Sequence, residues 1–90
     1  MRRPVTSSQF RRDVKRAEKS GKDMEKLKTL IRLLLAEQPL PAHYLDHSLK
    51  NNWKGYRDAH IEPDWLLIYC IAGDELRLAR TGTHADLFEE

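Results

Sequence analysis

Residues 65–71 read WLLIYCI, and this unbroken apolar run constrains the fold more than any other segment of the chain. A strand with one face in water alternates apolar and polar residues, whereas a run without alternation is typical of a central strand covered on both faces. The run is far shorter than the roughly 20 residues of a membrane-spanning helix. We therefore expect Trp65–Ile71 to be the central strand, with Cys70 as a small core residue rather than a reactive thiol.

The segment before residue 40 has the apolar spacing of two helices. Thr6 and Gln9 stand in the Thr-x-x-Gln order of a capping box, which predicts that the first helix begins beside Thr6. Its apolar stripe comprises Phe10, Val14 and Ala17. Gly21 suits the left-handed conformation that ends a helix.

Asp23 then offers an N-cap for a second helix. Its broad apolar face comprises Met24, Leu27, Leu30, Ile31, Leu34 and Leu35. Pro39 and Pro41 cannot continue this helix, so it should end near Glu37 or Gln38. Because the link between the helices is short, they should form an antiparallel hairpin.

From Trp53 the period changes to two, which indicates a β-meander. One face of its first strand would carry Lys54, Tyr56, Asp58 and His60, and the other Trp53, Gly55, Arg57, Ala59 and Ile61. Turn residues at 62–64 and 73–74 bound the central strand, and Glu75–Thr81 follows as a third strand with Leu76 and Leu78 facing the core. We read residues 2–6 as a further strand, 39–52 as a loop and 82–90 as a turn and short tail.

These elements predict an α+β fold in one domain of residues 1–90. A helical hairpin would pack on one face of a small antiparallel sheet, and the other face would be partly open. Arg80 conflicts with simple alternation, which puts it on the core face with Leu76 and Leu78. Either it lies at the strand end and reaches around, or a bulge resets the parity.

The charge is unevenly distributed. Residues 1–35 contain eleven Lys and Arg against four Asp and Glu, while residues 36–90 contain five against ten. A basic helical face indicates contact with a polyanion such as nucleic acid, and the alternative is a solvated face balanced by the acidic half. The single cysteine excludes an internal disulfide, and the N-terminus lacks the apolar stretch of a secretory signal, so we expect a cytoplasmic protein.

Four histidines lie outside the predicted helices, at positions 43, 47, 60 and 84. Two histidines in one cleft can act as general acid and general base, which is what cleavage of an RNA phosphodiester requires. The candidate cations are Lys54, Arg57 and Arg80, and the candidate stacking platforms for nucleobases are Trp65 and Phe88. A plain RNA-binding module would explain the charge but leaves the histidines, Asp58, Asp64 and Arg80 without a role.

His43 and His47 are four residues apart, the spacing of two metal ligands on a helix. The nearby prolines argue against a helix, and no cysteine or acidic ligand stands at zinc-site spacing. We therefore predict no metal site.

The run WKGYRDAHIEPDWLLIY, followed by RTGTHADLF, resembles the YafQ-type toxins of bacterial type II toxin–antitoxin systems, in the RelE/ParE superfamily. The similarity extends through KDMEKLKTLI and DHSLKNNWKG over nearly the whole chain. It implies the RelE-like fold and an endoribonuclease that enters the aminoacyl site of the ribosome and cuts mRNA without a metal or other cofactor.

The resemblance also implies site residues. The matching motifs give His47, His60, Asp64, Arg80 and His84 as the active-site set, with His84 favoured as general acid, His47 or His60 as base and Arg80 opposing the phosphate charge. Phe88 would hold a substrate base, and Lys54, Asp58 and Trp65 are further candidates for substrate binding. The basic residues that would contact ribosomal RNA are Arg11, Arg12, Lys15, Arg16, Lys19, Lys22, Lys26 and Lys28.

The resemblance implies two direct partners, an antitoxin and the 70S ribosome with its mRNA. Operator DNA would be bound only through the antitoxin complex, and no membrane partner is expected. Two alternatives remain at this point. The ParE branch shares the fold but inhibits DNA gyrase by binding, and the catalytic histidines favour a nuclease instead. A free-standing ribonuclease would cut naked RNA, which the small number of strong bases in the predicted cleft disfavours.

Overall fold

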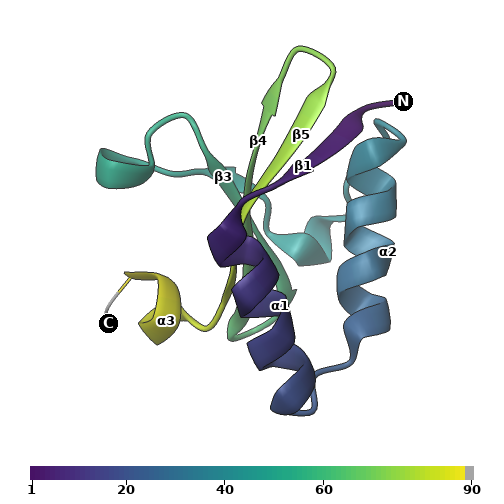
Figure 1. Cartoon of the computed structure of the whole chain (residues 1–90). Coiled ribbons are helices and arrows are strands. Elements are labelled where there is room, and N and C mark those ends of the chain that lie inside the picture. The colour runs from purple at the N-terminus through teal and green to yellow at the C-terminus, as the bar shows by residue number, and fades with distance from the viewer. Residues whose placement is uncertain (89–90) are drawn as a thin grey trace.

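A five-stranded sheet in the order β1-β5-β4-β3-β2 runs through the middle of the computed structural model, which describes residues 1–88 (Figure 1). In chain order the elements are β1 (Arg3–Thr6), α1 (Ser8–Lys19), α2 (Met24–Leu35), η1 (Ala42–Tyr44), β2 (His47–Ser48), η2 (Asn51–Trp53), β3 (Arg57–Glu62), β4 (Trp65–Ala72), β5 (Glu75–Gly82) and α3 (His84–Phe88). The end of the predicted tail, residues 89–90, lies outside the described residues.

β4 is the central strand, as its apolar sequence predicts, and its residues from Trp65 to Cys70 are buried. Strands β2 to β5 pair antiparallel, whereas β1 pairs parallel with β5. The sheet is therefore mixed, and the predicted α+β class is confirmed. Within residues 1–88, no helix combines the length and apolar character needed to cross a membrane.

The helix ends follow short-range capping. The Ser7 hydroxyl accepts a hydrogen bond from the Phe10 N–H at 2.9 Å, so Ser7 caps α1. The predicted cap at Thr6 is wrong, because Thr6 still pairs in β1. Gly21 ends the first helix with a φ of 83°, and Asp23 caps α2, both as predicted. The second helix ends at Leu35, before the predicted stop, because Glu37 already has a φ of 59°.

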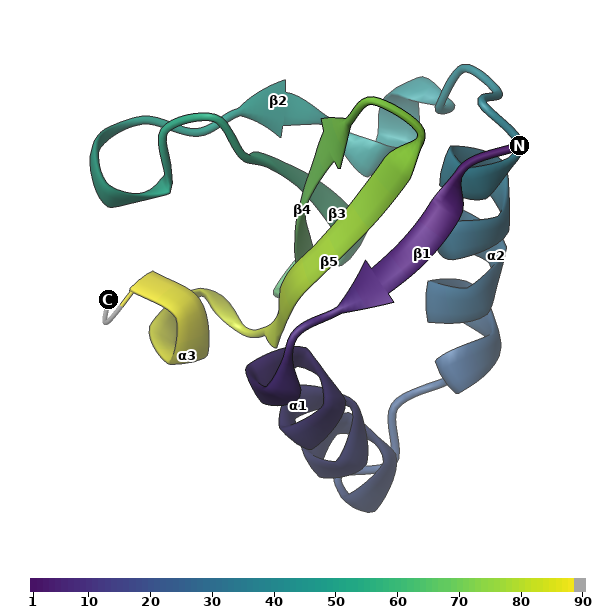
Figure 2. The same ribbon diagram turned by 45° about the horizontal axis from the view of Figure 1, so that its top comes forward.

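The two helices run in opposite directions but diverge from their link, and each packs on the sheet (Figure 2). Between helices and sheet lies the larger core. It comprises Phe10, Ala17, Leu27, Leu30, Leu34, Tyr44, Ala59, Ile61, Trp65, Leu67, Tyr69, Leu76 and Leu78. The alternating residues of β3, β4 and β5 contribute to it, as the period of two requires.

The opposite face has a smaller core beneath η2 and α3. Leu66, Ile68 and Leu87 are buried there, with Trp53 and Phe88 among the partly buried residues around them. The last segment is a short helix rather than the predicted turn. Thr83 and Asp86 form its capping box, because the Thr83 hydroxyl accepts from the Asp86 N–H and the Asp86 carboxylate accepts from the Thr83 N–H, both at 3.1 Å.

The start of the meander differs from the prediction. β3 begins at Arg57, because residues 51–53 form a 3₁₀ turn and Gly55 has a φ of 92°. The alternation counted from Trp53 therefore holds only from Arg57 onward. Trp53 packs on the face opposite Ala59 instead of beside it, and Lys54 belongs to the turn rather than to the strand.

A bulge in β5 settles the position of Arg80. Tyr69 of β4 is in register with Leu78, and the adjacent Ile68 is in register with Arg80, so one extra residue is inserted in β5 at Ala79. Leu78 therefore faces the larger core, while Arg80 lies on the opposite face with Ile68. The sequence allowed either a strand end or a bulge at Arg80, and the structure has the bulge.

Candidate active site

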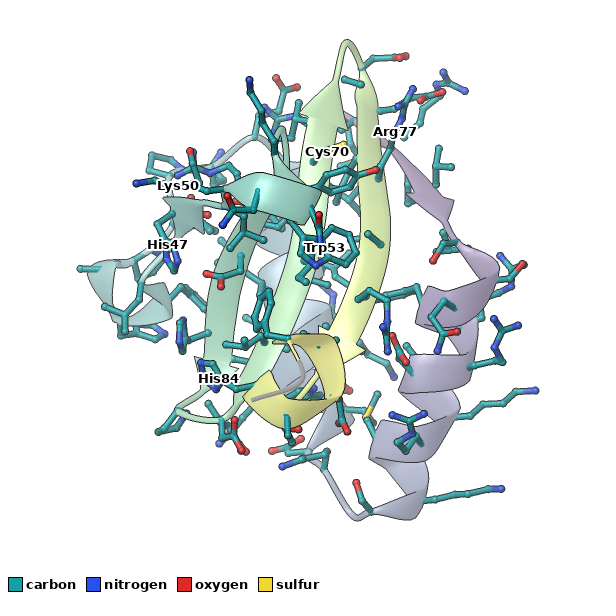
Figure 3. The ribbon with its side chains drawn as sticks, turned by 90° about the vertical axis from the view of Figure 1, so that its left-hand side faces the viewer. His47, Lys50, Trp53, Cys70, Arg77 and His84 are labelled. Carbon is teal, nitrogen blue, oxygen red and sulfur yellow. The ribbon has the colours of Figure 1, made fainter. Side chains whose placement is uncertain are left out.

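Cross-strand register brings the predicted polar residues into one row. His47 is in register with Asp58, Asp58 with Ile68, and Ile68 with Arg80, across β2, β3, β4 and β5. Residues directly opposite in antiparallel strands point to the same face. Because neighbouring strands lie about 4.8 Å apart, the Cα atoms of Asp58 and Arg80, two strands from each other, are separated by roughly 10 Å. Both side chains lie on the face away from α2. Figure 3 looks onto this face, where His47 and His84 are labelled.

Three histidines lie next to one another in this face. The ring centroid of His60 is 6.3 Å from that of His47 and 5.6 Å from that of His84. His60 is therefore the middle member, and His47 and His84 flank it. Each outer ring is partly exposed, at 54% for His47 and 38% for His84, so both can meet a ligand from solvent.

Asp64 fixes the orientation of His84. Its Oδ1 accepts hydrogen bonds from the His84 backbone N–H at 2.9 Å and from the ring Nδ1 at 2.6 Å. These two bonds lower the pKa of Asp64, so the carboxyl is ionised at neutral pH. With Nδ1–H committed to Asp64, the Nε2 atom of His84 is left for a ligand.

His47 is held in a similar way on β2. Its Nδ1 is 2.8 Å from the carbonyl oxygen of Leu45 and 3.0 Å from Oδ1 of Asp58. A carbonyl oxygen only accepts, so Nδ1 carries a hydrogen, and in the neutral ring Nε2 is then the acceptor. Asp58 itself is 4% exposed. Burial raises its pKa, although His47, His60 and His84 all act to lower it.

Arg80 is anchored by a buried carboxylate that the sequence did not reveal. Its Nε lies 2.7 Å from Oδ2 of Asp13 and its Nη2 lies 3.1 Å from Oδ1, in a bidentate pair. The side chain of Asp13 is fully buried and also accepts from the Thr81 N–H and from Gln9. The available signal was its spacing: Asp13 lies three residues after Phe10 and four before Ala17, on the apolar stripe of α1.

A cleft of about 380 Å³ opens beside this row, between η2 and α3. Arg80, Trp53 and Phe88 are among the residues that line it. The Phe88 ring lies 6.4 Å from the His84 ring, so the cleft continues the histidine row.

Other predicted residues lie elsewhere. Trp65 is 1% exposed in the larger core, and its indole N–H donates to Thr81 Oγ1 at 3.0 Å, so it is not available to stack on a base. Arg57 is bound to Asp46 and Ser48. His43 lies beside Tyr44, with ring centroids 4.2 Å apart. In the part of the chain that the structure describes, no group of three or more His, Cys, Asp or Glu is arranged to hold a metal ion.

Several of the basic residues predicted to contact RNA are already engaged. Arg11 bonds Thr6 and Ser8, Arg12 bonds Gln9, and Arg16 pairs with Asp86. Lys22 and Lys26 both pair with Glu62. The remaining members of this set, Lys15, Lys19 and Lys28, are exposed.

Comparison with known proteins defines the class to which this fold and site belong. A family model described as "Bacterial toxin of type II toxin-antitoxin system, YafQ" matches residues 2–89. The protein is therefore a toxin of a bacterial type II toxin–antitoxin system. More narrowly, the chain belongs to the YafQ family, as the sequence resemblance implied.

Individual relatives agree over the whole fold. The chain is 60% identical over 83 residues to the mRNA interferase toxin YafQ of Escherichia coli BL21-DE3, covering 91% of this chain and 90% of that one. The E. coli DinJ–YafQ complex matches at 57% identity with a TM-score of 0.91, over 98% of this chain and 99% of that chain. A crystal structure of a histidine mutant of E. coli YafQ matches at 55% identity with a TM-score of 0.93 and the same coverage.

Proposed function

We propose that this toxin is an mRNA interferase that cuts mRNA in the aminoacyl site of the ribosome, using general acid–base catalysis by its own histidines. The single observation that carries the proposal is the row of three histidines, two of them oriented by hydrogen bonds through Nδ1, beside an anchored arginine. The reaction class, endonucleolytic cleavage of mRNA, is supported by the name mRNA interferase that the E. coli relatives bear.

The chemistry is a transesterification within the RNA strand. The 2′-oxygen attacks the adjacent phosphorus, and the bond from phosphorus to the 5′-oxygen of the next nucleotide breaks. A general base takes the proton of the 2′-hydroxyl, and a general acid gives a proton to the leaving 5′-oxygen. The products are a 2′,3′-cyclic phosphate and a 5′-hydroxyl.

The positions of the histidines favour one assignment. Base and acid stand on opposite sides of the phosphorus in an in-line displacement, and His47 and His84 are the outer pair of the row. We assign the base to His47, whose Nε2 is a free acceptor when its Nδ1–H bonds the Leu45 carbonyl. We assign the acid to His84, because Asp64 holds its ring through Nδ1 and leaves Nε2 for the leaving oxygen.

The remaining residues act on the phosphate and the nucleobase. His60, between the outer pair, would face the phosphate oxygens. Arg80 would oppose the charge that develops on them, in an orientation set by Asp13. Phe88 would stack against a nucleobase at the end of the row.

The partners belong to the same proposal. The solved DinJ–YafQ complexes of E. coli support a cognate antitoxin for this toxin, and operator DNA would be bound through that complex alone. The ribosome would be bound by the basic residues of α1 and α2 that are not engaged within the protein. Translation in bacteria takes place in the cytoplasm, where we place the protein.

The test is 5′-end mapping of a reporter mRNA in a reconstituted translation system. We expect cuts at in-frame codon positions that require the ribosome, with naked RNA left intact. His84→Ala should reduce the cleavage rate by roughly 100- to 10,000-fold, the usual contribution of one general acid. Ribosome-independent cuts would contradict the aminoacyl-site assignment. Absence of any cut, with growth still arrested in cells, would reject the nuclease and direct attention to gyrase.

A further inference from the structure

The cleft between η2 and α3 is lined on its η2 side by residues that the acid–base mechanism does not use. One wall is the turn Lys50–Trp53, and the other is the end of α3 with Leu87 and Phe88. Figure 3 shows Trp53 between this turn and α3, with Lys50 at the outer edge of the turn. The cleft is thus an extension of the histidine row with two aromatic side chains and amide groups in its walls.

The charges in the cleft suit a nucleotide. Lys50 contributes one cation, and Arg80 contributes a second that is paired with the buried Asp13. One carboxylate, Asp86, also lines it, but this group accepts the Thr83 N–H and lies 3.7 Å from Arg16. The volume of about 380 Å³ falls within the range of small-ligand pockets, about 300–1,000 Å³.

The turn that forms the outer wall is rigidly held. The N–H groups of Trp53, Lys54 and Tyr56 donate to carbonyls within the turn, and the Leu49 N–H donates to the Tyr56 carbonyl at 2.9 Å. The Trp53 ring packs edge-on against Tyr56 at 5.4 Å. A wall of this kind loses little conformational entropy when it meets a ligand.

Asn51 and Asn52 are both among the residues that line the cleft on this wall. Both are exposed, and within residues 1–88 neither amide has a hydrogen-bond partner in the protein. Asn51 has a φ of 59°, a left-handed conformation that asparagine and aspartate tolerate better than most residues. An amide offers a donor and an acceptor side by side, which is the pattern needed to pair with the edge of a nucleobase.

We propose that this cleft binds one unstacked nucleobase of the message next to the bond that is cut, and that Asn51 and Asn52 read its edge. The inference rests on the proposed function and names a specificity element for it. Trp53 and Phe88 give stacking surfaces that accept any base, so the selectivity comes from the two amides. The acid–base chemistry of cleavage does not depend on this recognition of the base.

The first test measures base preference. Cleavage on programmed ribosomes is scored for messages that vary each nucleotide around the cut, with wild type, Asn51→Asp and Asn52→Asp. Aspartate keeps the size and the backbone tolerance of asparagine but removes the donor. The matched control is Gln38→Glu, the same amide-to-carboxylate change at an exposed site beyond α2. We expect a roughly 5- to 150-fold change of preference at one position in at least one asparagine variant, and none in the control.

A second test needs no cleavage. The free protein is titrated with a trinucleotide of 2′-deoxyribose, which lacks the attacking hydroxyl, and followed by nuclear magnetic resonance. The Trp53 indole and the Asn51 and Asn52 amides should shift, while the buried Trp65 indole stays constant. An unchanged preference profile in both asparagine variants, or shifts confined to the histidines, would overturn the inference. A wild-type protein that does not cut on ribosomes would instead contradict the proposed function. The titration would still test whether the cleft binds a nucleobase.

Discussion

Asp13 and Asp58 are both buried, yet their pKa values are shifted in opposite directions. Burial alone raises the pKa of a carboxyl, and in Asp58 it prevails over the neighbouring histidines. For Asp13, burial acts in the same direction, but hydrogen bonds from Arg80, Gln9 and Thr81 together lower the pKa. Ionised Asp13 therefore contributes to the free energy of unfolding at neutral pH, whereas ionised Asp58 lowers it.

Asp13→Asn should destabilise the protein by about 2–3 kcal/mol at pH 7, because it breaks a bidentate pair and leaves Arg80 without its partner. A lowered folded pKa gives stability that is present above the unfolded value of 3.8 and is lost as pH falls through the folded value. Thermal unfolding between pH 2 and 7 should show the two proteins converging in acid. A gap of constant size across this range would contradict the assignment.

Asp58→Asn should have the opposite effect on stability. A raised folded pKa means that stability falls as pH rises from the unfolded value through the folded one, and the variant avoids that loss. We expect a higher melting temperature than wild type at neutral pH, together with cleavage reduced about a hundredfold as His47 loses its carboxylate neighbour. A variant that is both less stable at neutral pH and fully active would refute this reading.

At the residue scale, the sequence predicted the histidines of the proposed site better than the residues that hold the site in place. His47, His60 and His84 come together because motifs place them on neighbouring strands and a short helix. Asp13 was missed because charge on a helix normally indicates solvent exposure. Trp65 was misassigned because an aromatic beside a histidine motif can equally belong to the core, and only packing decides.

At the element scale, long periodic segments were predictable and short ones were not. α1, α2 and β4 follow from apolar spacing alone. α3 spans too few residues to show a period, η2 interrupts the alternation before β3, and the bulge at Ala79 depends on pairing with β4. These short elements line the cleft, so the site was less predictable than its scaffold.

Thr83→Ala tests whether cleavage depends on the capped conformation of α3. The change removes the hydroxyl that accepts from the Asp86 N–H, a cap typically worth about 1 kcal/mol. Because His84 and Phe88 both belong to α3, we expect cleavage to fall by more than the small loss of stability suggests. Thr29→Ala, at an exposed site within α2, serves as the control and should leave melting temperature and cleavage nearly unchanged. Equal activity in both variants would mean that α3 does not depend on its cap.

At the scale of the whole molecule, the two faces of the sheet are covered differently. α1 and α2 lie on one face, where they bury the larger core (Figure 1), while η2 and α3 lie over the smaller core on the other face, which also carries the histidine row. The layers followed from the order of elements, but the prediction of a purely antiparallel sheet was wrong, because β1 pairs parallel with β5. The charge asymmetry did not translate directly into a free basic surface, because Lys22 and Lys26 pair with Glu62.

A double charge reversal at Lys15 and Lys19 should therefore weaken ribosome binding more than the same change at Lys22 and Lys26. Removing one lysine–phosphate interaction should lower the slope of log affinity against log salt by roughly one. Ribosome affinity measured across a salt series, with folding checked by melting temperature, gives the answer. If both pairs change the slope equally, exposure of the basic residues does not govern binding.

The most direct test of the central claim replaces a single 2′-hydroxyl of the message. A ribosome-bound mRNA with 2′-deoxyribose at the nucleotide before the mapped cut retains every base and phosphate but has no internal nucleophile. Our account predicts that cleavage at this bond stops, while the unmodified message yields a 2′,3′-cyclic phosphate and a 5′-hydroxyl. Cleavage of the modified message at an undiminished rate would show that an external nucleophile attacks the phosphorus, and would contradict the roles given to His47 and His84.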